Sequence, residues 1–357
     1  MIHKQNQNKT SPLSFFVKKK GKPFVGELQV RDVIYKTVVV KLPVLVPGGL
    51  CAPPRRIECP CLAVLRADAK QLKACKGKAC VLYLHGNGTD IGGAAEEAKT
   101  LARELDCHVL VPEYPGYGLA EGESSEDSVD AATHSAVRFA VETLGVPHER
   151  LVIYGRSVGT GPAAAAAARM TALSPLGPPA ALVLHSPYTS ILEYAREKAG
   201  GLLSYLLVSE RWPTRSNLTK VGCPTLLIHG DRDEVIPFRH SAKLRKDAAK
   251  RANAQKTGER RGGTSDRGSN DDRSNGSAQT GLVQLHVQKN ASHNVFDFYG
   301  DVADPIASFL KRHERAPWRA GGEQREPMGL DLRHLDARVQ QAGPGEMEEY
   351  PFASAAV

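Results

Sequence analysis

The segment VIYGRSVGTG, residues 152–161, decides how this chain is interpreted, because an apolar strand runs there into a glycine, a serine and a second glycine. An alanine-rich stretch follows at once and is typical of a helix. Two interpretations fit this pattern. One is a strand-to-helix turn that needs small residues, and the other is a tight turn that projects the hydroxyl of Ser157 into an active site. The two make different demands on the rest of the chain.

The composition is that of a globular protein. Of the 357 residues, 41% are hydrophobic and 24% are charged, which suits one domain of roughly 200–250 residues with tails. The seven cysteines stand at positions 51, 59, 61, 75, 80, 107 and 223. Their spacings match no standard zinc pairing. We therefore predict free, reduced thiols and no metal.

The beginning of the chain is polar and lacks the apolar segment of a signal peptide, and no run of about 18 apolar residues is present. We therefore expect a cytoplasmic protein. The net charge is +8, and residues 1–50 hold nine Lys or Arg against two acids. The stretch SFFVKKKGK, residues 14–22, favours either peripheral contact with an anionic membrane surface or a solvated basic tail. No nucleic-acid partner is expected, because no recognition motif is present.

Strands and helices alternate along most of the chain. Residues 27–46 are rich in β-branched residues and predict one or two strands. Six further strands are predicted at residues 79–86, 108–114, 151–155, 181–186, 224–230 and 282–288. Residues 126–144 carry apolar side chains at steps of three and four, which predicts a helix. The alternation predicts an α/β fold with a mostly parallel central sheet and helices on both faces.

We divide the chain into a basic, flexible segment (1–26), one α/β domain (27–313) and a low-complexity tail (314–357). Within the domain, residues 192–216 include an apolar helical stretch and are predicted to form a small cap over the site. Residues 250–281 lack aliphatic side chains beyond alanine, which predicts a disordered insert.

Two further segments meet the demands of a reactive serine. A serine hydroxyl is a weak nucleophile, so it needs a base to take its proton and a carboxylate to orient that base. Asp233 follows the predicted strand TLLIHG, and His293 follows the strand LVQLHVQ. In the order Ser157, Asp233, His293, each after a strand, the three lie at one edge of the sheet. Asp231 is better placed to hold the turn, and Glu234 is a weaker alternative acid.

The reaction also needs N–H donors for the negative charge that develops on a carbonyl oxygen. The predicted donors are the backbone amides of Val158, directly after the serine, and of Asn87, in the loop after an earlier strand. A phosphate-binding loop is the alternative for His85-Gly86-Asn87-Gly88, but the spacing of the known phosphate motifs is missing. The predicted substrate-binding residues are Gly86, Tyr117, Tyr188 and Leu206.

Six blocks of this sequence together resemble the α/β-hydrolase superfamily, and within it the α/β-hydrolase domain-containing protein 17 group. They are LYLHGNGTDIG, PEYPGYGLAEGESSE, ERLVIYGRSVGTGPA, LVLHSPYTS, CPTLLIHGDRDEVIPF and ASHNVFDFY. The resemblance covers roughly residues 60–312 without the insert. It implies the α/β-hydrolase fold and a serine hydrolase with Ser157 as nucleophile, Asp233 as acid and His293 as base, without a cofactor. Members of this group remove palmitate from cysteines of membrane-bound proteins, so an acylated protein or a small acyl ester is the expected substrate.

Two features depart from the pattern of that group. Its amino-terminal cysteine cluster, which is palmitoylated, is absent from this start, and a long insert separates the acid from the base. We expect a serine hydrolase of thioesters or esters that resembles a palmitoyl-protein thioesterase. The alternatives are a peptidase, lipase or esterase of the same fold and a non-catalytic, hydrolase-like scaffold.

Overall fold

The computed structural model describes residues 26–30, 33–48, 53–68, 78–172, 177–199, 211–261 and 283–313. Residues 1–25 of the predicted basic segment, the predicted tail and Leu206 lie outside these ranges. Within the described ranges, none of the helices combines the length and hydropathy needed to span a lipid bilayer.

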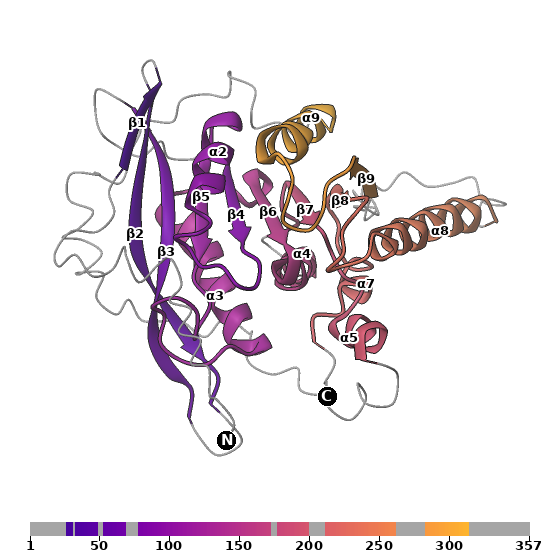
Figure 1. Ribbon diagram of the computed structural model, residues 1–357, viewed down its shortest axis with the longest axis horizontal. Coiled ribbons are helices and arrows are strands. Elements are labelled where there is room, and N and C mark those ends of the chain that lie inside the picture. Colours follow the sequence, from indigo (N-terminus) through magenta and orange to yellow (C-terminus); the bar gives the residue numbers. More distant parts are fainter. Residues whose placement is uncertain are drawn as a thin grey trace, which may run out of the picture.

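The described residues form a nine-stranded sheet in the order β1-β2-β3-β5-β4-β6-β7-β8-β9 (Figure 1). The strands are β1 (Gly26–Val30), β2 (Val33–Val46), β3 (Arg55–Asp68), β4 (Cys80–Leu84), β5 (His108–Pro112), β6 (Leu151–Arg156), β7 (Ala181–His185), β8 (Thr225–Gly230) and β9 (Val283–Gln288). The pairs from β1 to β5 are antiparallel, and every pair from β5 to β9 is parallel. The predicted, mostly parallel sheet is therefore confirmed.

The helices are α2 (Ala95–Glu104), α3 (Glu126–Arg138), α4 (Thr160–Ala172), α5 (Ile191–Ala199), α7 (Thr214–Asn217), α8 (Arg239–Arg261) and α9 (Asp304–Arg312). Side chains of α3, α4 and the start of α8 pack on one face of the sheet, and those of α2 and α9 on the other. The parallel strands are covered on both sides, which is why β4, β5, β7 and β8 are buried along their whole length.

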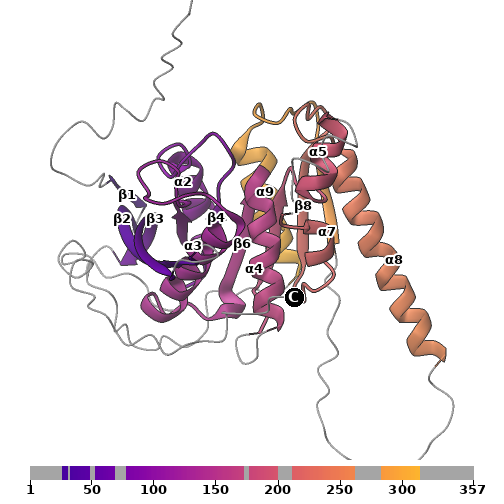
Figure 2. The same ribbon diagram turned by 90° about the horizontal axis from the view of Figure 1, so that it is seen from below.

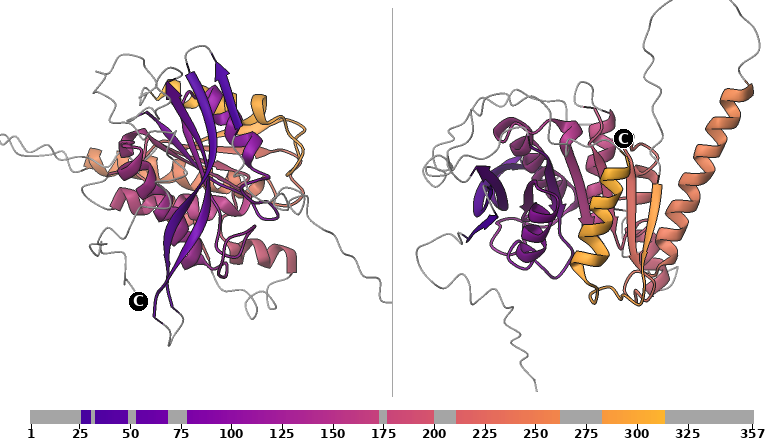
Figure 3. Two further views of the ribbon diagram at one scale, coloured as in Figure 1. Left: turned by 90° about the vertical axis from the view of Figure 1, so that its left-hand side faces the viewer. Right: turned by 90° about the horizontal axis from the view of Figure 1, so that it is seen from above.

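The predicted strands and the predicted helix 126–144 are present. That helix forms as α3 and continues as a π-helix, Phe139–Thr143. β3, however, was missed. It pairs with β2 from Val33–Asp68 to Val46–Arg55, and Figure 3 (left) shows the two as a long, twisted pair. Pro60 lies inside β3, and a proline argues against a central strand because it has no N–H for the ladder.

The prediction of disorder in residues 250–281 is wrong at its beginning, because α8 extends to Arg261. Figures 2 and 3 show α8 running away from the sheet at one end of the molecule. Lys, Arg, Ala, Gln and Glu are good helix formers and make up nine of residues 250–261. The absence of aliphatic residues therefore did not exclude a helix here. Residues 262–281 lie outside the described part of the chain, as do residues 200–210 of the predicted cap.

Candidate active site

Ser157 stands at the turn between β6 and α4 and has a φ of +53°, a left-handed conformation that is rare for a residue with a side chain. Two glycines allow this turn to close. A Cβ on Gly155 would lie 2.4 Å from the carbonyl oxygen of Gly159, and a Cβ on Gly159 would lie 2.1 Å from that of Leu84. The G-x-S-x-G spacing is therefore required by close backbone packing, and the strained turn raises the serine above the carboxyl edge of the sheet.

The structure brings the three predicted catalytic side chains together. Nε2 of His293 lies 3.0 Å from Oγ of Ser157, and Nδ1 lies 2.8 Å from Oδ2 of Asp233. The side chains come from the loops after β6, β8 and β9. With Nδ1–H donating to the carboxylate, Nε2 is left to accept the serine proton. The geometry is that of a serine-histidine-aspartate triad.

The carboxylate of Asp233 is held on both oxygens. Oδ1 accepts the backbone N–H groups of Val235 at 3.0 Å and Ile236 at 2.8 Å. Oδ2 faces His293 and, at 3.3 Å, Nε2 of His229. Burial raises the pKa of this carboxyl, but the hydrogen bonds from His229 and His293 outweigh burial and hold the pKa well below its usual range. Asp233 is therefore ionised at neutral pH and can accept the hydrogen bond from Nδ1 of His293.

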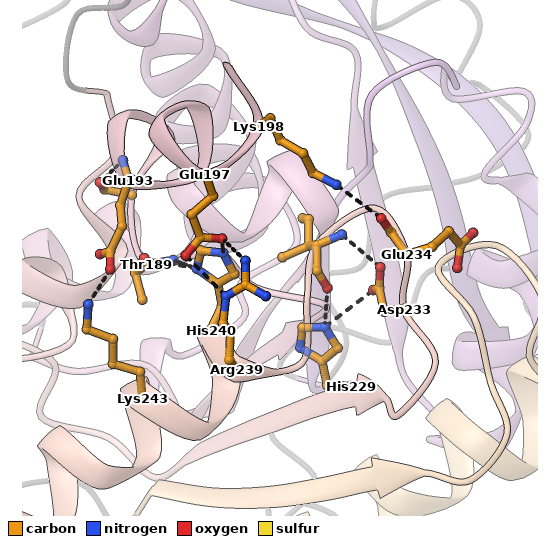
Figure 4. Close-up of polar contacts among 12 residues, drawn as sticks. Thr189, Glu193, Glu197, Lys198, His229, Asp233, Glu234, Arg239, His240 and Lys243 are labelled. Atoms are coloured by element: carbon orange, nitrogen blue, oxygen red, sulfur yellow. Dashed lines mark hydrogen bonds and ion pairs between the residues drawn. The ribbon is translucent and has the colours of Figure 1, made fainter. Parts of the chain in front are cut away.

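His229 was missed by the sequence analysis. It is fully buried, and its Nδ1 accepts a hydrogen bond from the hydroxyl of Ser241 at 2.7 Å. Its Nε2 donates to the carbonyl oxygen of Ile236 at 2.8 Å, so that the ring braces the loop that carries Asp233 (Figure 4). One signal was present in the sequence, namely a histidine at the end of an apolar strand on the same sheet edge.

The other two candidate acids have different partners. Oδ1 of Asp231 accepts the backbone N–H of Asn290 at 2.7 Å and so links the acid loop to the turn after β9. Oε2 of Glu234 accepts the backbone N–H of His293 at 3.4 Å. Its carbonyl oxygen accepts Nζ of Lys198 at 3.1 Å (Figure 4). Among the three acids, Asp233 is the one brought to the imidazole ring.

Helix α5, which begins the predicted cap, is fixed beside the acid loop. Glu197 on α5 pairs with Arg239 at 2.5 Å and with Nε2 of His240 at 3.1 Å, and Glu193 pairs with Lys243. These contacts join α5 to the first turns of α8 (Figure 4). Burial lowers the pKa of His240, which keeps the ring neutral. The start of the predicted cap is therefore attached to the same end of the molecule as the acid loop.

The loop after β4 lies against the nucleophile. A Cβ on Gly86 would be 3.4 Å from Cβ of Ser157, which is van der Waals contact and places the backbone of this loop directly beside the nucleophile. Asn87, the next residue, accepts at its side-chain oxygen the hydroxyl of Tyr117 at 2.7 Å. Tyr117 therefore contacts the predicted oxyanion loop directly, and its position beside that loop is compatible with the predicted substrate contact.

A buried pair holds the beginning of this loop. Nε2 of His85 lies 3.0 Å from Oε1 of Glu113, and both side chains are almost completely buried. The hydroxyl of Tyr114 donates to the carbonyl oxygen of His85 at 2.9 Å, and the two rings stack with centroids 4.1 Å apart. The segment 113–117 thus clamps the loop that carries the predicted amide of Asn87.

Val158 lies in the first turn of a short 3₁₀ helix, Ser157–Gly159. N–H groups in a first helical turn have no partner within the helix, so the amide of Val158 suits the predicted role. Tyr188, which was predicted to bind substrate, lies in the interior instead. It is 2% exposed, its hydroxyl donates to the carbonyl oxygen of Val158 at 3.3 Å, and a Cβ on Gly161 would lie 2.0 Å from that hydroxyl. Tyr188 packs beneath the nucleophile turn and does not line an open substrate site.

The cysteines of the described chain are buried in the core. They are Cys59, Cys61, Cys80, Cys107 and Cys223, and all five are free. Burial raises the pKa of Cys59 to about 11, which keeps the thiol protonated. Within the described residues, no group of three or more His, Cys, Asp or Glu side chains is arranged to hold a metal ion.

Comparisons with known proteins agree with this fold. The chain is 35% identical over 164 residues to the α/β hydrolase domain-containing protein aho-3 of Caenorhabditis elegans, covering 46% of each chain. It is 31% identical over 167 residues to the human α/β hydrolase domain-containing protein 17B, covering 47% of this chain and 54% of that protein. The chain thus spans about half the length of the curated relatives it matches. No protein-family model matches it.

Solved structures show the same architecture. An esterase from Pyrococcus furiosus superposes with a TM-score of 0.51 at 14% identity, over 77% of this chain and 90% of that chain. An α/β hydrolase from Vibrio vulnificus superposes with a TM-score of 0.51 at 17% identity, over 78% and 81%. The fold is the α/β-hydrolase fold. In sequence, the chain is similar to the α/β-hydrolase domain-containing protein 17 relatives.

Proposed function

We propose that this chain is a serine hydrolase that cleaves acyl thioesters or esters through an acyl-enzyme, with palmitoyl groups on protein cysteines as its substrate class. The observation that carries the proposal is the chain of hydrogen bonds from Oγ of Ser157 through His293 to Asp233. A supporting observation is the set of buried contacts of His85 with Glu113 and Tyr114, which hold the loop that carries the predicted amide of Asn87.

In the proposed reaction Ser157 attacks the acyl carbon while Nε2 of His293 takes the hydroxyl proton. Asp233 stabilises the imidazolium, and the amides of Val158 and Asn87 hold the negative oxygen. The tetrahedral intermediate collapses, and the departing thiol or alcohol takes the proton from His293. Water then attacks the acyl-enzyme with the same base, and the fatty acid leaves. The chain's own residues supply every proton transfer, so that this scheme uses no cofactor.

The substrate class rests on the similarity to the domain-containing protein 17 group, whose sequence blocks this chain shares. A carboxylesterase or lipase of short or long acyl esters is the second candidate, and it is supported by the structural likeness to an esterase. The two candidates share the triad and differ in the acyl and leaving groups that they accept.

We propose further that the enzyme works in the cytoplasm, peripheral to an anionic membrane that residues 1–26 contact through their basic side chains.

A fluorophosphonate probe tests the hydrolase proposal. We expect rapid labelling of the wild-type chain and none of Ser157→Ala, since loss of the nucleophile removes the covalent step. Ser135→Ala is the matched control, because that hydroxyl is bonded to the carbonyl oxygen of Pro43 at 2.8 Å. A folded wild-type chain that is not labelled would contradict the proposal and favour the scaffold.

The substrate class needs a separate experiment. Rates on p-nitrophenyl esters of two to sixteen carbons are compared with the rate on a palmitoyl-cysteine peptide. We expect the rate to rise with chain length and to be high on the thioester. A preference for acetyl esters would contradict the palmitoyl assignment and favour the carboxylesterase candidate.

Vesicle sedimentation tests the proposed membrane contact. The full chain with Lys18, Lys19 and Lys20 changed to Gln should sediment less with phosphatidylserine vesicles than the wild type. Equal sedimentation would remove the basic segment from the proposal.

A further inference from the structure

We infer that Arg156, the residue directly before the nucleophile, is a positioning residue that holds the histidine of the triad at its distance from Ser157. The inference rests on the proposed function, because it assigns a role in the same reaction. Arg156 occupies a position of the G-x-S-x-G motif at which the motif itself asks for no particular residue type. The sequence pattern alone therefore assigns Arg156 no role.

The guanidinium of Arg156 makes three contacts with the loop that carries the base. One terminal nitrogen donates to the backbone carbonyl oxygen of His293 at 3.2 Å and to Oδ1 of Asn294 at 3.2 Å. The guanidinium carbon also lies 5.0 Å from the centroid of the Phe296 ring, within the range of a cation–π interaction. All three partners lie within four consecutive residues, so that one side chain engages the whole turn.

The topology explains why such a connection is needed. Ser157 follows β6 and His293 follows β9, and β7 and β8 lie between these strands in the sheet. No ladder of backbone hydrogen bonds joins β6 to β9 directly. On the far side, the base loop is attached to the acid loop, where the carbonyl oxygen of Ala291 accepts the backbone N–H of Arg232 at 3.0 Å. On the near side, Arg156 connects the loop to the strand that carries the nucleophile.

Phe296 gives the guanidinium a fixed surface. Its ring packs edge-on against His185 with centroids 4.8 Å apart. His185 is buried at the end of β7, and its Nδ1 lies 3.2 Å from the hydroxyl of Tyr154 on β6. Burial lowers the pKa of His185 well below its usual value, and the charge of Arg156 lowers it further, so the ring is neutral. The ring of Phe296 is therefore held against the strands of the sheet. The guanidinium of Arg156 lies between this ring and the turn that carries His293.

Arginine suits this place better than lysine. Its planar guanidinium presents several N–H donors in one plane and stacks on an aromatic ring at the same time. A lysine ammonium is a compact, strongly hydrated charge and does not stack in this way. We therefore expect Lys at this position to support catalysis less well than Arg, although the charge is kept.

The test compares full-length wild type with Arg156→Ala and Arg156→Lys on a short p-nitrophenyl ester. We expect kcat to fall about ten- to a hundredfold in Arg156→Ala, because small displacements of a catalytic group cost that much, with KM changed by less than about twofold. Arg156→Lys should lie between the two. Added methylguanidinium should restore part of kcat in Arg156→Ala and should not raise that of wild type. Arg103→Ala, which removes an exposed arginine on α2, is the matched control and should retain kcat.

The outcomes separate this inference from the proposed function. Absence of fluorophosphonate labelling in the wild type would overturn the proposed function, and the inference with it. Labelling of the wild type together with an unchanged kcat in Arg156→Ala would overturn the inference alone, as would a raised KM at unchanged kcat, which would make Arg156 a substrate contact. Should Arg156→Ala fail to fold, Arg156→Gln keeps most of the side-chain volume and is expected to lose kcat as well. A folded Arg156→Gln with wild-type kcat would likewise contradict the inference.

Discussion

Oδ2 of Asp233 lies 2.8 Å from Nδ1 of His293, and this contact determines which nitrogen of the imidazole carries the proton. Asp233→Asn keeps the size of the side chain but presents an amide that can donate to Nδ1. The ring then keeps its proton on Nε2 and no longer accepts one from the serine. We expect kcat for ester hydrolysis to fall about 10⁴-fold.

Asp231→Asn is the control for that variant. Asp231 bonds a backbone N–H in the neighbouring turn, and we expect its amide variant to stay within about threefold of wild type. Equal losses in Asp231→Asn and Asp233→Asn would contradict the assignment of the acid. The measurement is steady-state hydrolysis of a p-nitrophenyl ester, with thermal unfolding to confirm that both variants are folded.

The same carboxyl predicts how stability depends on pH. Burial opposes ionisation of Asp233, but hydrogen bonds from His229 and His293 hold its pKa in the folded state below the usual value. The unfolded chain therefore binds this proton more tightly, because the pKa of an aspartate in an unfolded chain is roughly 3.9. The contribution to stability is fully present above that value and is lost as pH falls below it. In urea unfolding, the difference in unfolding free energy between wild type and Asp233→Asn should be constant from about pH 7 to 5 and should shrink below about pH 4. A difference that grows on acidification would contradict this account.

Tyr117→Phe distinguishes two roles for the hydroxyl that donates to Asn87 at 2.7 Å. If the bond holds the predicted oxyanion loop, its loss affects the transition state more than the bound substrate. We then expect kcat to fall about three- to tenfold, as loss of one hydrogen bond of about 1 kcal/mol implies, with KM little changed. A raised KM at constant kcat would instead support the substrate contact predicted from the sequence. Tyr299→Phe, at a 52% exposed tyrosine, is the control.

The sequence was sufficient to predict where Ser157, Asp233 and His293 lie in the fold. Ser157 and Asp233 follow short apolar strands, His293 follows a strand of alternating apolar and polar residues, and in a parallel sheet the carboxyl ends of the strands meet at one edge. Local patterns and chain order suffice for this prediction. They do not suffice for Arg156 or His229, since the roles of these residues depend on contacts with side chains and carbonyl groups that the fold brings together.

Two other predictions went wrong for physical reasons. Tyr188 follows a strand at the same edge, but its side chain packs inward against Gly161. The sequence block LVLHSPYTS, which contains Tyr188, does not show on which side of the chain the aromatic ring lies. Residues 250–261 lack aliphatic side chains beyond alanine, but the backbone hydrogen bonds of helix α8 do not require them. Helix propensity and aliphatic content are separate signals, and here they disagree.

Close packing at the nucleophile turn predicts an unequal effect of two alanine substitutions. In Gly159→Ala the new Cβ would lie 2.1 Å from the carbonyl oxygen of Leu84, so α4 must move away from β4. Overpacking of this kind costs about 1–3 kcal/mol or more. Gly88 has a φ of +76° but nothing within 4 Å of an added Cβ, so Gly88→Ala should cost only about 1–2 kcal/mol of backbone strain. Equal losses of unfolding free energy in urea would contradict the packing argument.

The buried thiols predict the result of a titration with Ellman's reagent. The chain has seven cysteines, and five of them are buried and free in the described structure. Burial raises the pKa of Cys59 to about 11, so at pH 8 almost no thiolate forms at this site to attack the reagent. We expect at most two thiols to react rapidly in the native chain and all seven after denaturation. The double variant Cys51→Ser/Cys75→Ser should show no rapid phase, whereas Cys59→Ser should leave the rapid phase unchanged. A rapid phase that persists in the double variant would mean that one of the five core thiols is reached by solvent.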